Sequence, residues 1–173
     1  MKRIFLTGYM GAGKTTVGRS LAAELGLSFI DLDLYIEGRF HKEIRQIFAE
    51  KGEEGFRDIE RRMLHEVAEF EDVLVSTGGG TPCFFDNAAF MNAQGTTIYL
   101  KVSVDELAAR LETCKQTRPV LQNRSGEELK LFIAENLQAR EPFYQQARVI
   151  FDAEQMTGPE DVYRITEQLK EMI

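Results

Sequence analysis

Short apolar runs alternate with longer segments of helical periodicity along this chain. Five runs have the length and composition of strands, namely residues 3–6, 28–32, 73–76, 97–102 and 149–151. Strands that alternate with helices are joined by crossovers, so this order predicts a parallel sheet covered by helices, an α/β fold. The 173 residues suffice for one domain with a substantial core, and no repeat or linker divides them.

Several helix starts can be read from the same pattern. Apolar residues recur at helical spacing over 17–25, directly after a glycine-rich loop. Two later helices are predicted to begin at capping boxes, Ser103 with Glu106 and Thr157 with Glu160.

Two segments are longer than their connecting role requires. The polar, partly helical stretch 34–70 exceeds a simple crossover, so we expect it to carry a second binding region. The stretch 113–126 has little periodicity and contains Lys115, Arg118 and Arg124. It predicts a basic loop that acts as a lid over an anionic ligand.

The glycine-rich loop after the first strand has a specific motif. Gly8, Gly13, Lys14 and Thr15 match the pattern G-x-x-x-x-G-K-[ST], with Gly11 between them. Such a loop aims backbone N–H groups at a phosphate, while its Lys contacts the outer oxygens and its hydroxyl binds Mg²⁺. The helix that follows presents its positive N-terminal end to the same anion. The motif therefore predicts a phosphate-binding P-loop.

Asp31 and Asp33 stand at the end of the second predicted strand, at the edge where open α/β sheets bind ligands. Two residues apart in a strand, they are predicted to project to the same side. One carboxylate would support hydrated Mg²⁺, and the other would hold a substrate hydroxyl and accept its proton. The alternative is that either residue caps the helix that starts near Leu34.

Two arginines are candidates for binding a carboxylate. Arg57 and Glu60 are neighbours on a predicted helix, and an Arg held by a Glu is prepositioned for a planar ligand. A solvated surface ion pair has the same spacing. Arg140 lies near the end of a long helix that Pro142 should weaken or kink, so it is either a second carboxylate contact or a helix C-terminal cation.

Gly78, Gly79 and Gly80 follow the third strand and expose bare backbone to a ligand. Many P-loop proteins have a metal-binding Asp at this strand end. Its absence argues against a generic ATPase or GTPase and makes Asp31 the better carboxylate on the metal side. In the basic loop, Arg118 could close over the terminal phosphate, with a solvated loop charge as the alternative.

Composition excludes several other classes of protein. The net charge of −7 argues against a surface for nucleic acid or anionic membrane. Two isolated cysteines and two histidines argue against a structural zinc site. With no leader-like or long apolar segment, we expect a cytoplasmic protein, and with no coiled-coil repeat we expect a monomer.

Taken in order, these blocks resemble the shikimate kinase family. The matching blocks are the P-loop and its helix from Gly8 to Ala22, Asp31-x-Asp33, Phe56-Arg57-x-x-Glu60, Gly78 to Gly80, Arg118-Pro119 and Arg140-x-x-x-Tyr144. They span nearly the whole chain at compatible spacings, although only the P-loop is specific by itself.

The resemblance implies a single domain over 1–173 with a three-layer P-loop kinase fold. Its five-stranded parallel sheet would have the order 2-3-1-4-5 with helices on both faces, a substrate-binding region at 34–70 and a lid at 113–126. The implied reaction is transfer of the ATP γ-phosphoryl to the 3-hydroxyl of shikimate.

The resemblance also implies roles for individual residues. ATP would be bound by Gly11, Ala12, Gly13, Lys14, Thr15, Thr16, Arg110 and Arg118. Shikimate would be bound by Asp33, Arg57, Gly79, Gly80 and Arg140. The cofactor Mg²⁺ would be held by Thr15 and, through water, by Asp31, and the catalytic side chains would be Lys14, Asp33 and Arg118.

Two other functions are compatible with the P-loop. A related kinase acting on gluconate or a nucleoside monophosphate would keep the P-loop and lid, but it would have no evident need for both Arg57 and Arg140. A regulatory module without catalysis would be expected to lose residues such as Lys14, Thr15, Asp33 or Arg118, and all four are present.

Overall fold

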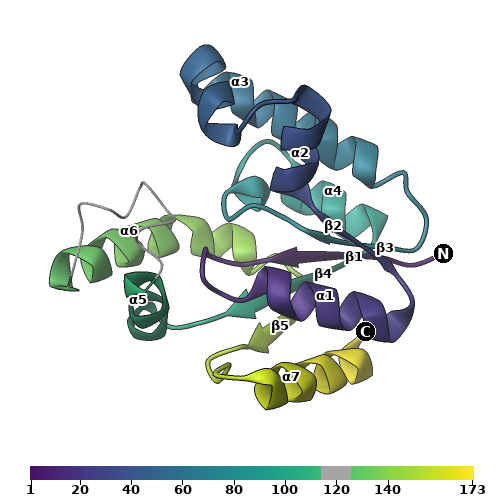
Figure 1. Cartoon of the computed structure of the whole chain (residues 1–173), viewed down its shortest axis with the longest axis vertical. Helices are drawn as coiled ribbons and strands as arrows, with labels where there is room; N and C mark the ends of the chain where they lie inside the picture. The colour runs from purple at the N-terminus through teal and green to yellow at the C-terminus, as the bar shows by residue number, and fades with distance from the viewer. Residues whose placement is uncertain (114–125) are drawn as a thin grey trace.

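A sheet of five parallel strands forms the centre of the computed structural model, which describes residues 1–113 and 126–173 (Figure 1). The strands are β1 (Arg3–Thr7), β2 (Ser28–Asp31), β3 (Val73–Ser76), β4 (Thr96–Lys101) and β5 (Val149–Asp152). Their order is β2-β3-β1-β4-β5, and Leu6 of β1 lies opposite Ser76 of β3 and Ile98 of β4. The predicted fold class and strand order are confirmed.

Helices cover both faces of this sheet. They are α1 (Lys14–Leu25), α2 (Leu32–Phe40), α3 (Ile44–Val67), the 3₁₀ turn η1 (Thr81–Cys83), α4 (Asn87–Gln94), α5 (Val104–Glu112), α6 (Gly126–Tyr144) and α7 (Pro159–Met172). Alternation along β1 sends Ile4 and Leu6 into a core with α1, α5, α6 and α7, and sends Phe5 into a second core with α2, α3 and α4. The sheet therefore separates two apolar layers, as the three-layer prediction required.

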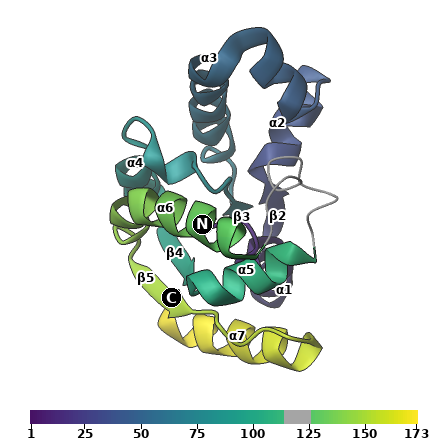
Figure 2. The ribbon, with the colours of Figure 1, turned by 90° about the vertical axis from the view of Figure 1, so that its left-hand side faces the viewer.

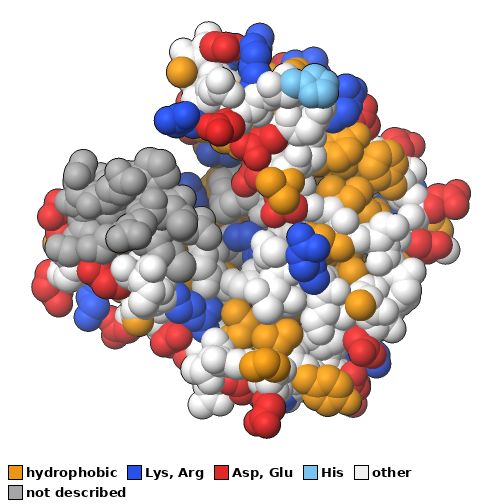
Figure 3. Space-filling model, in the orientation of Figure 1, with side chains coloured by type: hydrophobic (Ala, Val, Ile, Leu, Met, Phe, Trp, Pro, Cys, Tyr) orange, Lys and Arg blue, Asp and Glu red, His pale blue; other side chains and the backbone are white. Residues whose placement is uncertain are grey.

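The segment 34–70 forms an arm of two helices that rise side by side from the sheet (Figure 2). Arg39 of α2 donates two hydrogen bonds of 3.0 Å to Glu66 of α3, and the Tyr35 hydroxyl bonds to the same carboxylate. α3 is interrupted at Gly52, whose φ of 71° is not helical. Figure 3 shows a recess beneath this arm in which Lys and Arg side chains are visible.

Some local predictions were wrong in detail. The second strand ends at Asp31, one residue earlier than predicted, and α2 begins at Leu32 rather than near Leu34. α7 is capped by Gly158 rather than Thr157, whose hydroxyl and N–H instead donate to Asp161 at 2.9 and 3.0 Å. Thr157 therefore donates to the Asp161 carboxylate, one residue beyond the Glu160 of the predicted capping box.

Other local predictions were confirmed in part. The Ser103 side chain caps α5 by accepting from Glu106 N–H at 3.2 Å, but Ser103 N–H donates to Glu154 rather than completing a capping box. α6 runs through Pro142 as far as Tyr144.

The described helices include none that is both long enough and apolar enough to cross a bilayer.

Candidate functional site

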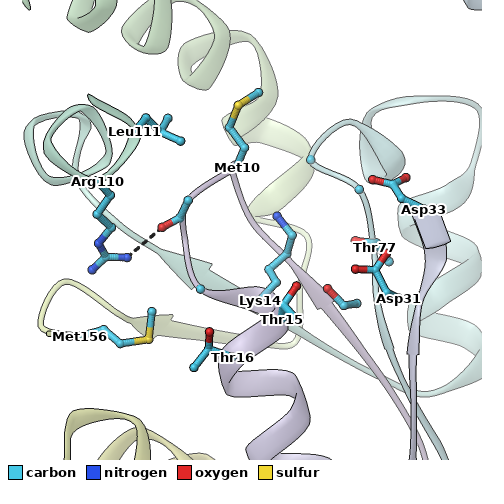
Figure 4. Close-up of a pocket in the computed structure, with 15 residues that line it drawn as sticks. Met10, Lys14, Thr15, Thr16, Asp31, Asp33, Thr77, Arg110, Leu111 and Met156 are labelled. Carbon is cyan, nitrogen blue, oxygen red and sulfur yellow. Dashed lines mark hydrogen bonds between the residues drawn. The ribbon is translucent and has the colours of Figure 1, made fainter. Parts of the chain in front are cut away.

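A cavity of about 410 Å³ opens at the carboxyl ends of β1, β2 and β3. It is lined by Met10, Gly11, Gly13, Lys14, Thr15, Thr16, Asp31, Asp33, Ser76, Thr77, Gly78, Gly79, Arg110, Leu111 and Met156. Figure 4 shows the two aspartates on the opposite side of Lys14 and Thr15 from Arg110 and Met156. The parallel topology brings these segments together, because every strand ends at the same edge.

The loop between β1 and α1 has the geometry that its glycines predict. Gly8, Gly11 and Gly13 have φ values of 150°, 88° and 97°, which side chains with a Cβ rarely adopt. The Ala12 N–H donates to the Tyr9 carbonyl at 3.1 Å and closes the turn, and α1 begins at Lys14. The loop thus delivers the positive end of α1 to the cavity.

Lys14 lies across this loop. Its ammonium donates to the carbonyls of Gly8 at 2.6 Å and Tyr9 at 3.2 Å. Thr15 and Thr16, on the first turn of α1, line the cavity beside it. A mobile cation and hydroxyl oxygens therefore meet at the mouth of the loop.

Asp31 and Asp33 both line the cavity, but not for the predicted reason. Asp31 is the last residue of β2 and the N-cap of α2, where its Oδ1 accepts from Leu34 N–H at 3.1 Å. Asp33 lies in the first turn of α2, so the alternation of a strand does not relate the two side chains. The capping alternative is confirmed for Asp31 and does not apply to Asp33.

The carboxylate of Asp33 is unusual in its protonation. Burial, followed by the charges of Glu60 and Asp31, raises its pKa from 3.8 to about 6, although the Lys14 ammonium opposes the shift. A carboxylate with this pKa is mostly ionised at neutral pH and is a stronger base than an ordinary Asp. Such a group suits proton transfer at neutral pH.

Arg57 is a largely buried, ion-paired residue rather than a surface one. Its Nη1 lies 2.9 Å from Glu60 Oε1, and the two side chains are 13% and 1% exposed. Its guanidinium carbon lies 4.1 Å from the Phe84 ring centroid. The surface alternative is therefore wrong, and Arg57 is held in place before any ligand arrives.

The glycines after β3 allow charged side chains to approach the backbone. A Cβ on Gly80 would lie 2.8 Å from Arg57 Nη2, and one on Gly79 would lie 3.1 Å from Arg140 Nη1. A Cβ on Gly78 would lie 3.3 Å from Asp33 Oδ1. We call residues 78–80 the glycine loop; close approach, rather than special φ values, explains these glycines.

Arg140 belongs to this cluster although it comes from α6. Its guanidinium carbon lies 5.5 Å from the ring centroid of Tyr9 in the P-loop. Arg57 and Arg140 lie against the glycine loop, next to the cavity rather than in its wall. Two cationic side chains thus lie beside the cavity that Asp33 lines.

The family model described as shikimate kinase matches residues 10–170. The chain belongs to the shikimate kinase family. Among curated relatives, the shikimate kinase of Parabacteroides distasonis is 69% identical over 173 residues and covers 100% of both chains.

Solved structures of shikimate kinases support the same family membership. The crystal structure from Bacteroides thetaiotaomicron has a TM-score of 0.96 and 53% identity, covering 99% of this chain and 97% of that one. The structure from Acinetobacter baumannii in complex with shikimate has a TM-score of 0.86 and 32% identity, covering 99% and 92%. The resemblance seen in the sequence blocks is confirmed.

In this shikimate kinase family member, Arg110 is part of the structure around the P-loop. Its Nη1 donates to Gly11 O at 3.0 Å, the contact dashed in Figure 4, and its Nη2 donates to the Ala153 and Glu154 carbonyls at 2.9 Å. Its Nε is paired with Glu106 at 3.0 Å. Arg110 therefore joins α5, the P-loop and the segment after β5.

Two predicted features lie wholly or mostly outside the described residues. They are Arg118 and the proposed lid, of which the structure describes only residues 113 and 126.

The sequence did not indicate the place of Met156. Its Cε lies 2.0 Å from where a Cβ on Gly13 would be, so its thioether packs directly on the P-loop. An isolated Met between β5 and α7 carries no motif, and only the fold reveals this contact.

Proposed function

We propose that the protein transfers the γ-phosphoryl group of ATP to the 3-hydroxyl of shikimate, giving 3-phosphoshikimate and ADP. Membership of the shikimate kinase family supports this, as do relatives of that name that match over their whole length. A related structure that contains shikimate supports the identity of the acceptor.

The arrangement of Asp33, Arg57 and Arg140 around the glycine loop is the observation that carries the proposal. Shikimate is a small molecule with one carboxylate and three hydroxyls. Two arginines and the backbone of Gly79 and Gly80 would bind the carboxylate, and Asp33 would bind the hydroxyls. A gluconate or nucleotide acceptor would give no evident use to both cations.

ATP would bind along the P-loop. The backbone from Gly11 to Thr16 would surround its phosphates, and Lys14 would leave the Gly8 and Tyr9 carbonyls to contact the β and γ oxygens. Arg110 would lie on the nucleotide side of the cavity, where it also holds the Gly11 carbonyl.

The donor atoms at the mouth of the loop fit Mg²⁺. The hydroxyl of Thr15 and the carboxylate of Asp31 are hard oxygen ligands that line one cavity. No group of three or more His, Cys, Asp or Glu side chains that could hold a metal occurs among the described residues, which suits an ion carried in with the nucleotide. Thr15 would bind it directly and Asp31 through water. When bound, Mg²⁺ neutralises charge on the phosphates.

Positioning and charge neutralisation would then account for catalysis. Asp33 would orient the acceptor hydroxyl and take its proton, since its raised pKa of about 6 leaves it ionised but basic at neutral pH. Lys14 would stabilise charge on the transferred group, joined by Arg118 from a lid at 113–126 that excludes water. In this assignment, 34–70 is the acceptor-binding region of a single domain. A monomeric state and a cytoplasmic location stay predictions.

An ADP-release assay with Mg·ATP tests the proposal. We expect release with shikimate but not with gluconate, AMP, CMP or no acceptor, and a product heavier by one phosphoryl group in the mass spectrum. Release with another acceptor would keep the phosphate site and discard shikimate. Nucleotide binding without acceptor-dependent release would favour the regulatory module.

A further inference from the structure

Two buried tyrosines lie side by side behind the glycine loop. The rings of Tyr99 in β4 and Tyr144 at the end of α6 have centroids 4.9 Å apart and an interplanar angle of 31°. Both are almost fully buried, at 1% and 0% exposure. Their hydroxyls make different bonds: Tyr99 donates to Glu141 at 2.7 Å, whereas Tyr144 donates to the Gly79 carbonyl at 2.6 Å.

The Tyr144 bond links α6 to the glycine loop across 65 positions of sequence. One helical turn earlier on α6, Arg140 faces the same glycine, with its Nη1 3.1 Å from the position of a Gly79 Cβ. One face of α6 thus provides both the hydroxyl that holds Gly79 and the cation that stands beside it.

The Tyr144 hydroxyl keeps its proton and can therefore act as a hydrogen-bond donor. Burial raises the pKa of Tyr144 well above its ordinary value of 10, even though the nearby Arg140 charge acts in the other direction. The hydroxyl is therefore protonated, and able to donate, at neutral pH.

The bond also determines where the following N–H points. In a trans peptide the C=O and the next N–H lie in one rigid plane and point in opposite directions. Holding the Gly79 carbonyl therefore directs the Gly80 N–H away from Tyr144. Glycine peptides need such an anchor most, because no side chain restricts their rotation.

We propose that Tyr144 is a positioning residue of the acceptor site. Its hydroxyl fixes the Gly79–Gly80 peptide so that the Gly80 N–H and the Arg140 guanidinium both face the acceptor carboxylate. This role rests on the proposed function, because it needs a carboxylate ligand at the glycine loop.

Tyr144→Phe tests the role, with Tyr99→Phe as the matched control. Both variants remove one buried hydroxyl from the same ring pair, but only the first frees the Gly79 carbonyl. We expect Tyr144→Phe to raise the KM for shikimate roughly threefold to tenfold and to leave the KM for ATP unchanged. Tyr99→Phe should leave both values unchanged, and a ¹⁵N shift of the Gly80 amide should appear in Tyr144→Phe alone.

The outcomes separate the role from the proposed function. An unaltered protein that phosphorylates shikimate, together with an unchanged shikimate KM in Tyr144→Phe, would overturn the role alone. Equal increases in both variants, or an equal loss of ATP affinity, would reduce Tyr144 to a general structural residue and overturn it too. Failure of the unaltered protein to phosphorylate shikimate would overturn the proposed function and the role together.

Discussion

Glu60 and Arg57 form an ion pair 2.9 Å long in which the carboxylate is 1% exposed. The second oxygen of Glu60 accepts from the Thr81 hydroxyl at 2.9 Å. This pair therefore connects α3 to the turn that follows the glycine loop. Because the buried Glu60 carboxylate is itself held by Thr81, it fixes the position of the Arg57 guanidinium.

Removing Glu60 should destabilise the protein strongly. We expect Glu60→Ala to lower the free energy of unfolding by about 3–5 kcal/mol, because it leaves the largely buried Arg57 charge with only the exposed Glu53 carboxylate, 3.8 Å away. Asp58→Ala is the control, since Asp58 pairs with Arg62 on the surface of the same helix and should change stability by less than about 1 kcal/mol. Urea titrations of both variants measure the difference, and equal losses would contradict the buried-pair account.

The pH dependence of turnover should report on Asp33. With its pKa near 6, this carboxylate gains a proton as pH falls, so kcat/KM for shikimate should decrease by about tenfold per pH unit below that value. Asp33→Asn should reduce kcat by about 10²–10⁴-fold with ATP binding intact, and its residual activity should lack this limb.

Glu60→Gln should move the same limb to lower pH, because the Glu60 charge contributes to the raised pKa. Near-normal turnover of Asp33→Asn, or a flat profile between pH 7 and 5, would exclude Asp33 as the base.

The ionised Asp33 carboxylate should lower the stability of the folded protein. The pKa of Asp33 is higher in the folded protein than its ordinary value of 3.8, so the ionised group opposes folding above pH 6. That cost falls as the pH drops below about 6, and it vanishes only below 3.8, where the carboxyl is protonated in both the folded and the unfolded state. Asp33→Asn should therefore raise Tm at pH 7.5 by roughly 2–4 °C, about 1 kcal/mol for a chain of this size.

The stabilisation should shrink when calorimetry is repeated at pH 4.5. The control is Asp58→Asn, which changes an exposed aspartate on α3. A lower Tm for Asp33→Asn at pH 7.5 would contradict this account of the Asp33 charge.

A methyl group on Gly80 should disturb ligand binding more than folding. The Cβ would lie 2.8 Å from Arg57 Nη2, so the guanidinium would have to shift from its place, while the Gly80 φ of −94° is allowed for alanine. We expect Gly80→Ala to raise the KM for shikimate by roughly tenfold or more through loss of charge-assisted bonds, with the ATP KM unchanged.

Gly38→Ala is the control for this substitution. Nothing lies within 4 Å of its Cβ position in α2, so this variant should be kinetically normal. If Gly80→Ala binds shikimate as tightly as the unaltered protein does, the close contact between Arg57 and the glycine loop is not required for shikimate binding.

Much of the fold could be predicted because the signals are local. A strand followed by Gly8, Gly13 and Lys14 predicts a turn with positive φ values and a helix, and the structure has both. Alternating apolar runs predicted the sheet, and the resemblance to the family predicted its order. These features depend on short-range backbone preferences and hydrophobic periodicity.

Burial could not be predicted in the same way. The spacing of Arg57 and Glu60 is identical in a surface pair and in a buried one, and only the packing of the glycine loop against α3 distinguishes them. Asp33 was predicted to share a strand with Asp31, but it reaches the cavity from a helix because the Asp31 side chain caps Leu34.

What the sequence determined by itself is the phosphate loop, the α/β class and the residues available for chemistry. The tertiary structure decided which of those residues meet: Gly79 contacts Tyr144 at a separation of 65 residues, and Arg110 reaches Gly11 across 99. Such contacts, and the raised pKa of Asp33, arise from chain segments brought together by burying the two apolar layers. No short stretch of sequence encodes that proximity, because it is a property of the whole packed core.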